Sequence, residues 1–96
     1  MYVVVRQYSG EGASELFDEL VNRRAEVEEL IRGVSGFVSY TLARTGDGGV
    51  SVTVCQDKTG TDASIQVAAS WIKENISMKV APPTVSEGET ILHFGA

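Results

Sequence analysis

The stretch that decides the fold is Gly36–Gln56, which reads GFVSYTLARTGDGGVSVTVCQ. It holds two runs rich in β-branched and aromatic residues, separated by the segment Gly46–Gly49. Strand-forming runs on either side of a short Gly/Asp segment are typical of a β-hairpin. The sequence therefore predicts two antiparallel strands joined by a tight turn in the middle of the chain.

The register of this hairpin decides which side chains share a face. Asp-Gly is a strong signature of a two-residue type I′ turn, so we expect a turn at Asp47-Gly48 that pairs Thr45 with Val50. Tyr40 and Leu42 then share a face with Ser51, Thr53 and Cys55. An odd-length loop with a bulge would place the same two side chains beside the valines of the second strand, because a shift of one residue exchanges the faces.

One strand and one helix are expected on each side of the hairpin. Tyr2–Tyr8 is rich in valine and aromatic residues, as strands are. Ala13–Arg32 and Thr61–Asn75 carry apolar residues at helical spacing. Thr90–Phe94 is a short apolar run near the end of the sequence, and we expect it to form the last strand.

The boundaries of these elements have their own signals. Ser14 is expected to cap the first helix and Thr61 the second, because their hydroxyls accept bonds from free backbone N–H groups. Gly33 fits the left-handed position that ends a helix. Pro82-Pro83 excludes a helix and favours an extended path, which can continue through Thr84–Ser86.

The resulting order is β-α-β-β-α-β, which is the ferredoxin-like arrangement. It predicts an α+β fold with an antiparallel sheet of strand order 4-1-3-2 and helices on one face only. We expect residues 1–96 to form a single domain, since the chain has 96 residues.

Two features call for a second layer on the other face of the sheet. Val3, Val4 and Val5 are consecutive, so both faces of the first strand are apolar. Phe37–Thr45 would be a long edge strand without Pro or Lys to protect it. A second copy of the chain, packed sheet against sheet in a two-fold homodimer, is the simplest cover.

Composition and charge exclude several partners. The net charge is −5, which disfavours nucleic acid and membrane surfaces as partners. The opening residues lack a basic segment followed by a long apolar run, so no secretion signal is expected. The single cysteine, Cys55, excludes an intrachain disulfide and suits a reducing cytoplasm.

Three segments resemble the antibiotic biosynthesis monooxygenase-like family: Gly36–Ser39 after a long helix, Gly48–Val52 on the next strand, and Pro82–Thr84 near the end. The resemblance implies a dimeric α+β barrel with a site between sheet and helices or in the barrel interior. Members include cofactor-free oxygenases of polycyclic phenols and quinones, haem-degrading enzymes and small-molecule isomerases.

The sequence departs from the catalytic patterns of this family. The oxygenases resemble one another in an Asn and a Trp four residues later, and the corresponding positions here are Thr53 and Asp57. The haem degraders have an Asn on the first strand and a His on the second helix. Here the first strand carries Arg6 and Gln7, and the second helix has no histidine.

Two residues are candidate catalytic groups. Arg6 lies on a strand, where a cavity-facing guanidinium would bind a carboxylate or a phenolate oxygen, although a salt bridge at the rim is the alternative. His93 is the only histidine, a candidate general base or axial haem ligand, or else a solvated histidine at a sheet edge. One His and one Cys do not make up the three or four ligands of a dedicated metal site, so none is expected.

A second group of residues is expected to contact a substrate. Arg44 would bind an anionic group, the aromatic side chains would stack on a flat molecule, and the small polar residues would line the cavity. For each of them packing in the core or at an interface is the alternative role. These candidates are Tyr8, Tyr40, Arg44, Thr53, Cys55 and Trp71.

Three interpretations of the function remain open. The first is a small-molecule-binding dimeric barrel that acts as a cofactor-free monooxygenase on aromatic or quinone-type substrates. The second is a non-catalytic module that binds a hydrophobic metabolite or haem. The third is a structural or regulatory dimer whose interior is filled by side chains.

Overall fold

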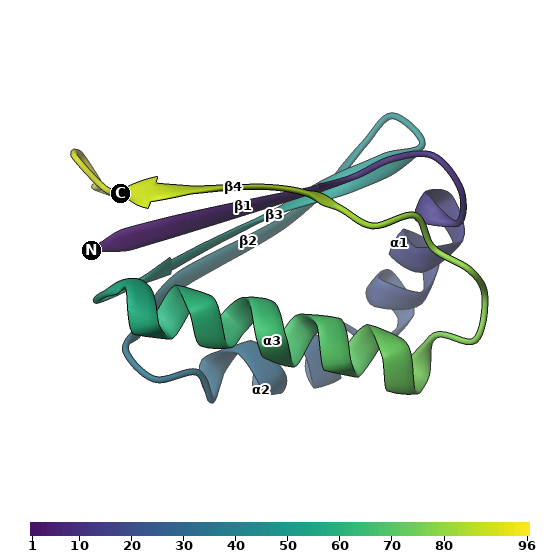
Figure 1. The fold of residues 1–96 in the computed structure, drawn as a ribbon, viewed down its shortest axis with the longest axis horizontal. Coiled ribbons are helices and arrows are strands. Elements are labelled where there is room, and N and C mark those ends of the chain that lie inside the picture. The colour runs from purple at the N-terminus through teal and green to yellow at the C-terminus, as the bar shows by residue number, and fades with distance from the viewer.

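The computed structural model describes all residues from 1 to 96. Four antiparallel strands form one sheet of order β2-β3-β1-β4, which is the predicted order read from the opposite edge. The helices cover one face of this sheet and leave the other face open (Figure 1). The elements are β1 Tyr2–Tyr8, α1 Ala13–Asn22, α2 Arg24–Arg32, β2 Phe37–Thr45, β3 Gly48–Cys55, α3 Lys58–Asn75 and β4 Thr84–Glu89.

The predicted single helix over residues 13–32 is wrong, because the structure breaks it at Arg23. Arg23 leaves helical geometry at φ −117° and ψ 31°, while its N–H still bonds to the carbonyl oxygen of Glu19. Its guanidinium donates to Glu26 and, at 2.8 Å, to Asn75 at the end of α3. The break therefore depends on contacts with a distant helix, and no Gly or Pro announces it in the sequence.

Both predicted helix caps lie elsewhere. Gly12, with φ 78°, precedes α1 in place of Ser14, and a Cβ at Gly12 would collide with the backbone carbonyl of Lys79. Asp57 caps α3 by accepting a bond from the N–H of Gly60 at 3.3 Å, so the helix begins earlier than Thr61. Only Gln56 separates Asp57 from the end of β3, so the strand passes into the helix with almost no loop.

The left-handed glycine after the helix is also displaced from its expected position. Gly33 is right-handed with φ −76°, whereas Gly36 has φ 71°. The carbonyl oxygen of Gly36 accepts a bond from the N–H of Gln56, which fixes the start of β2 against the end of β3.

The hairpin turn lies at Gly46-Asp47, and the predicted turn at Asp47-Gly48 is wrong. Thr45 pairs with Gly48, and only the first turn residue has a positive φ, as in a type II′ turn. Gly48 is needed inside the strand, because a Cβ there would collide with the carbonyl oxygen of Tyr8 on β1. Packing between strands thus overrides the local Asp-Gly signal.

Thr45 was predicted to pair with Val50, so the observed strand register differs from the predicted one by two residues. A register difference of two leaves each side chain on its predicted face. Tyr40 lies opposite Thr53, and Leu42 lies opposite Ser51, all on the helix-covered face. The expectation that Tyr40 and Leu42 share a face with the small polar residues of β3 is confirmed.

The last strand is β4, Thr84–Glu89, and the predicted strand at 90–94 is wrong. Thr84 pairs with Gln7 and Glu89 pairs with Tyr2, so β4 follows β1 along its whole length. The N–H of Thr90 bonds to the carbonyl oxygen of Met1 at 2.9 Å, and beyond this point β1 offers no further partner. The following apolar side chains are therefore left exposed, namely Ile91 (97%), Leu92 (76%) and Phe94 (83%).

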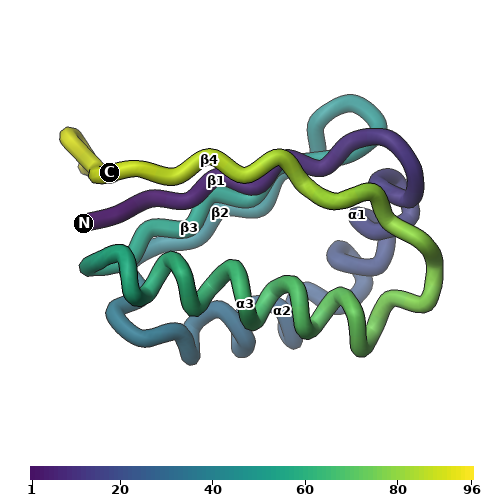
Figure 2. The backbone as a smooth tube through the Cα atoms, viewed as in Figure 1, coloured from purple at the N-terminus to yellow at the C-terminus, as the bar shows by residue number.

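The core lies between the sheet and the helices. Val4, Leu16 and Phe17 are almost completely buried there. On the opposite face, Val5 and Val52 are only half-buried. The helices all lie on the other side of the sheet (Figure 2). The sheet thus has one covered and one open face, as predicted.

Candidate functional site

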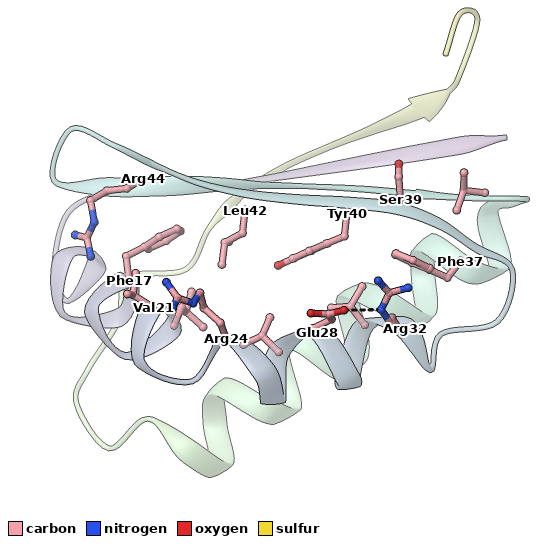
Figure 3. Close-up of a pocket in the computed structure, with 14 residues that line it drawn as sticks. Phe17, Val21, Arg24, Glu28, Arg32, Phe37, Ser39, Tyr40, Leu42 and Arg44 are labelled. Atoms are coloured by element: carbon pink, nitrogen blue, oxygen red, sulfur yellow. Dashed lines mark hydrogen bonds and ion pairs between the residues drawn. The ribbon is translucent and has the colours of Figure 1, made fainter. Parts of the chain in front are cut away.

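A groove of about 640 Å³ separates β2 from α1 and α2 (Figure 3). Most of its lining is apolar, and the side chains come from the inner faces of both layers. The chain changes direction at Arg23, between α1 and α2, and both helices contribute side chains to the groove. The apolar residues of the lining are Phe17, Leu20, Val21, Val27, Ile31, Phe37, Val38, Tyr40 and Leu42.

The charged residues of the groove are mainly arginines. Arg24, Arg32 and Arg44 line it, together with a single carboxylate, Glu28. Arg32 bonds to Glu28 at 2.8 Å, and Arg44 bonds to Asp18 at 2.8 Å, whereas Arg24 forms no ion pair. In a protein of net charge −5, this groove has a local excess of positive charge and suits an anionic group.

Tyr40 connects the groove with the interior. Its side chain projects from β2 with the hydroxyl pointing into the groove (Figure 3). The same side chain lines a small inner cavity of about 30 Å³, together with Arg6, Tyr8, Ser51 and Trp71. A group bound in the groove beside Tyr40 would therefore lie next to this inner cavity.

Burial perturbs both tyrosines of the inner cavity. Desolvation raises the pKa of Tyr8 and of Tyr40, and the positive charge of Arg6 opposes the rise in each case. Both tyrosines are therefore neutral hydrogen-bond donors near neutral pH. Tyr8 also packs edge-on against Phe17, with ring centroids 6.0 Å apart.

Arg6 is a buried cation without a carboxylate partner. Its exposed fraction is 4%, its Nε has no hydrogen-bond partner, and it forms no salt bridge. The hydroxyls of Ser51 and Thr53 on the same face are also buried without partners. Burying an unpaired charge costs on the order of several kcal/mol, so this polar cluster is not explained by packing.

The structure brings several of the candidate residues together. Arg6, Tyr8, Tyr40 and Trp71 meet at the inner cavity, and Arg44 lies in the groove. Thr53 is next to Tyr40 in the sheet but lines neither space.

Two candidates lie away from this site. Cys55 is fully buried where α3 begins, and burial, with a smaller contribution from the Asp57 carboxylate, raises its thiol pKa. A raised pKa disfavours the reactive thiolate.

His93 is exposed and follows β4 rather than lying on a strand. Its Nε2 is 3.4 Å from the hydroxyl of Ser39, which points away from the groove (Figure 3).

The sequence analysis missed the helix side of the groove. Arg24, Glu28 and Arg32 recur every four residues, which places them on one stripe of a helix. The spacing was visible in the sequence, but charge on a helix is usually a solvated face. Only the bend at Arg23 turns this stripe toward β2.

A haem group held by His93 does not fit this site, because His93 lies outside the groove. The lining contains no His, Cys or Met, and Tyr40 is its only side chain of a type that ligates haem iron. No group of three or more His, Cys, Asp or Glu side chains could hold a metal ion. None of the helices has the length and apolar character needed to cross a bilayer.

Comparison with known proteins rests on fold alone. Neither the protein-family models nor the curated proteins contain a match to this sequence. Among solved structures, a dimeric ferredoxin-like protein from an uncultured marine organism has a TM-score of 0.66 at 11% identity, over 99% of this chain and 96% of that one. The α+β class predicted from the sequence, with a ferredoxin-like fold, is therefore confirmed.

Two further structures share the fold. A monooxygenase from the gene ActVA-Orf6 of Streptomyces coelicolor, in complex with Nanaomycin D, has a TM-score of 0.61 at 20% identity, over 99% of this chain and 89% of that one. The haem degrader MhuD of Mycobacterium tuberculosis has a TM-score of 0.64 at 19% identity, over 99% and 100%. These neighbours agree with the resemblance to the antibiotic biosynthesis monooxygenase-like family.

Proposed function

We propose that the protein binds a flat hydrophobic small molecule with an acidic group in the groove between β2 and the helices α1 and α2. The single observation that carries this proposal is an apolar space of about 640 Å³ lined by three arginines. Pockets of this size and lining are typical of small-molecule sites.

The groove suggests how such a molecule would lie. Its apolar walls would take the ring system, and the partly exposed Phe37 can stack on it. Arg24 is the free cation of the groove, so it would bind a carboxylate or another planar anion through two parallel hydrogen bonds. Tyr40 would donate a hydrogen bond to an oxygen on the inner edge of the molecule.

Cofactor-free monooxygenation of an aromatic or quinone-type substrate is the second candidate. Tyr40 and the nearby positive charge of Arg6 favour this candidate, since together they would stabilise an anionic substrate oxygen. In such a reaction the substrate supplies the electrons, so that a ring CH2 and O2 give a C=O group and water. The solved monooxygenase with this fold supports the same candidate.

We also propose that two copies form a dimer through the open face of the sheet, in a reducing compartment such as the cytoplasm. Val5 and Val52 on this face are half-buried, and no helix of the chain lies over this face. The dimeric protein with the same fold and the free thiol of Cys55 support these two proposals. His93 would then lie near the subunit interface rather than in the groove.

The groove can be tested with a pair of fluorescent probes. An anilinonaphthalene sulfonate and its uncharged parent have the same rings but differ in the anionic group. The double variant Arg24→Met, Arg32→Met should bind the sulfonate about 10-fold more weakly, which corresponds to about 1.4 kcal/mol. It should bind the uncharged probe as the wild type does.

Lys73→Met is the matched control, since Lys73 is an exposed cation on α3 and outside the groove. Equal weakening in this control, or no weakening in the double variant, would contradict the proposal. The monooxygenase candidate is tested separately, by oxygen uptake with a panel of polycyclic phenols, where Tyr40→Phe should abolish any uptake.

A further inference from the structure

Arg6 lies at a wall shared by two separate cavities. On one side is the inner cavity of about 30 Å³ beside Tyr40. On the other side is a crevice of about 200 Å³ between α3 and the segment that leads into β4, lined by Ile72, Pro82 and Val85. Arg6 and Tyr8 line both spaces.

The polar groups around Arg6 are all able to donate hydrogen bonds. The guanidinium has only donors, and the hydroxyls of Tyr8, Tyr40 and Ser51 each carry one. No carboxylate forms an ion pair with Arg6, and Ser51 Oγ and Arg6 Nε are buried without a partner. A buried guanidinium with hydroxyl groups beside it, and with no carboxylate from the chain, suits a small anion.

We propose that Arg6 holds a small inorganic anion of halide size, which reaches it through the crevice between α3 and Pro82-Pro83. The inner cavity has room for a small ion or about two water molecules, which is less than a ring or a carboxylate-bearing chain requires. The crevice gives this anion a route that does not pass through the groove. The inference therefore stands independently of the groove ligand.

Neutral groups do not balance the charge of Arg6, although the hydroxyl oxygens of Tyr8 and Tyr40 can accept hydrogen bonds from it. A water molecule would accept one hydrogen bond from Nε but would leave the positive charge unbalanced in the interior. A second subunit on the open face would lie across the sheet from Arg6, because Arg6 projects with Val4 and Tyr8 to the helix-covered side. A mobile anion from the solvent remains as the counter-charge.

The test is the anion dependence of the melting temperature at constant ionic strength. Sodium chloride or bromide is exchanged for sodium gluconate, whose anion is too large for the inner cavity. An anion that binds only the folded protein raises Tm with its concentration, here by a rise on the order of 5 °C at several times its Kd. Arg6→Met should remove the rise, whereas Lys73→Met, which removes an exposed cation outside the groove, should keep it.

A crystal of the wild type grown in bromide gives a second readout that needs no variant. An anomalous peak beside the guanidinium of Arg6 is expected. The proposal is overturned if Arg6→Met keeps the full halide dependence, if the wild type shows no dependence, or if bromide appears only at surface lysines. Loss of sulfonate binding in the groove would leave this outcome unaffected, so the two proposals fail separately.

Discussion

The guanidinium of Arg23 lies over the ring of Trp71, 4.9 Å from its centroid, and this contact ties the bend between α1 and α2 to α3. The same guanidinium also bonds to Glu26 and to Asn75. The bend turns Arg24 and Arg32 toward β2, so the shape of the groove depends on a contact made on the opposite side of the helices.

Arg23→Ala should therefore destabilise the fold and loosen the groove. Loss of the contact with Trp71 and of the bond to Asn75 should lower the free energy of unfolding by more than the loss of an exposed ion pair does. Urea unfolding followed by Trp71 fluorescence measures this loss. Arg32→Ala is the control, because its exposed pair with Glu28 contributes only about 0.3–0.5 kcal/mol. Equal losses in both variants would show that the Arg23 contact has no special role.

Gly49 is required by packing, and Gly49→Ala should destabilise the protein. A Cβ at Gly49 would collide with the ring of Phe17, and such overpacking costs about 1–3 kcal/mol. Gly88→Ala on β4 is the matched control, since nothing lies within 4 Å of a Cβ there. Thermal unfolding of the two variants compares them directly, and a similar Tm for both would contradict the packing of Phe17 against β3.

The buried tyrosines should make the fold less stable at high pH. Burial raises the pKa of Tyr8 and Tyr40 above the ordinary value of 10.0, so the folded state retains protons that the unfolded state loses. Their contribution is fully present below pH 10 and is lost as the pH rises above it.

Absorbance at 295 nm during an alkaline titration measures this effect. Two of the three tyrosines should ionise only above their ordinary pKa or together with unfolding. The double variant Tyr8→Phe, Tyr40→Phe should lack this late step. A single titration of all tyrosines near pH 10 in the folded protein would contradict the burial of the pair.

The open face of the sheet should mediate dimerisation, so Val5→Lys should yield a monomer. A charge in a desolvated sheet-to-sheet interface is strongly unfavourable. Native mass spectrometry measures the mass of the assembly. Val85→Lys is the matched control, because Val85 pairs with Arg6 and so belongs to the opposite, helix-covered face. A dimer that survives Val5→Lys would place the interface elsewhere.

Local sequence patterns were sufficient to predict the order of the elements and the architecture of the sheet. The β-α-β-β-α-β order of the elements predicted the strand order of the sheet, and the consecutive valines of β1 predicted an apolar face on the side without helices. The face shared by Tyr40 and Ser51 was predicted as well, because a register error of two residues does not change faces.

The errors arose where distant contacts decide the local structure. The bend at Arg23 depends on Trp71 and Asn75, and the turn moves to Gly46 because the carbonyl oxygen of Tyr8 leaves no room for a Cβ at Gly48. The position of β4 in the sequence is set by pairing with β1 along its whole length, and not by the apolar residues at 90–94. The helix side of the groove was missed for the same reason, since Arg24 and Arg32 look like a solvated stripe in the sequence.

The position of β1 between β3 and β4 also affects how the chain folds while it is being synthesised. β1 is made early, whereas β4, its partner on one edge, is made late. During translation, β1 can pair with β3 while its other edge stays unpaired until residues 84–89 leave the ribosome. An unpaired strand edge promotes association between nascent chains. The vulnerable period in the life of this protein thus falls before its last strand has been translated.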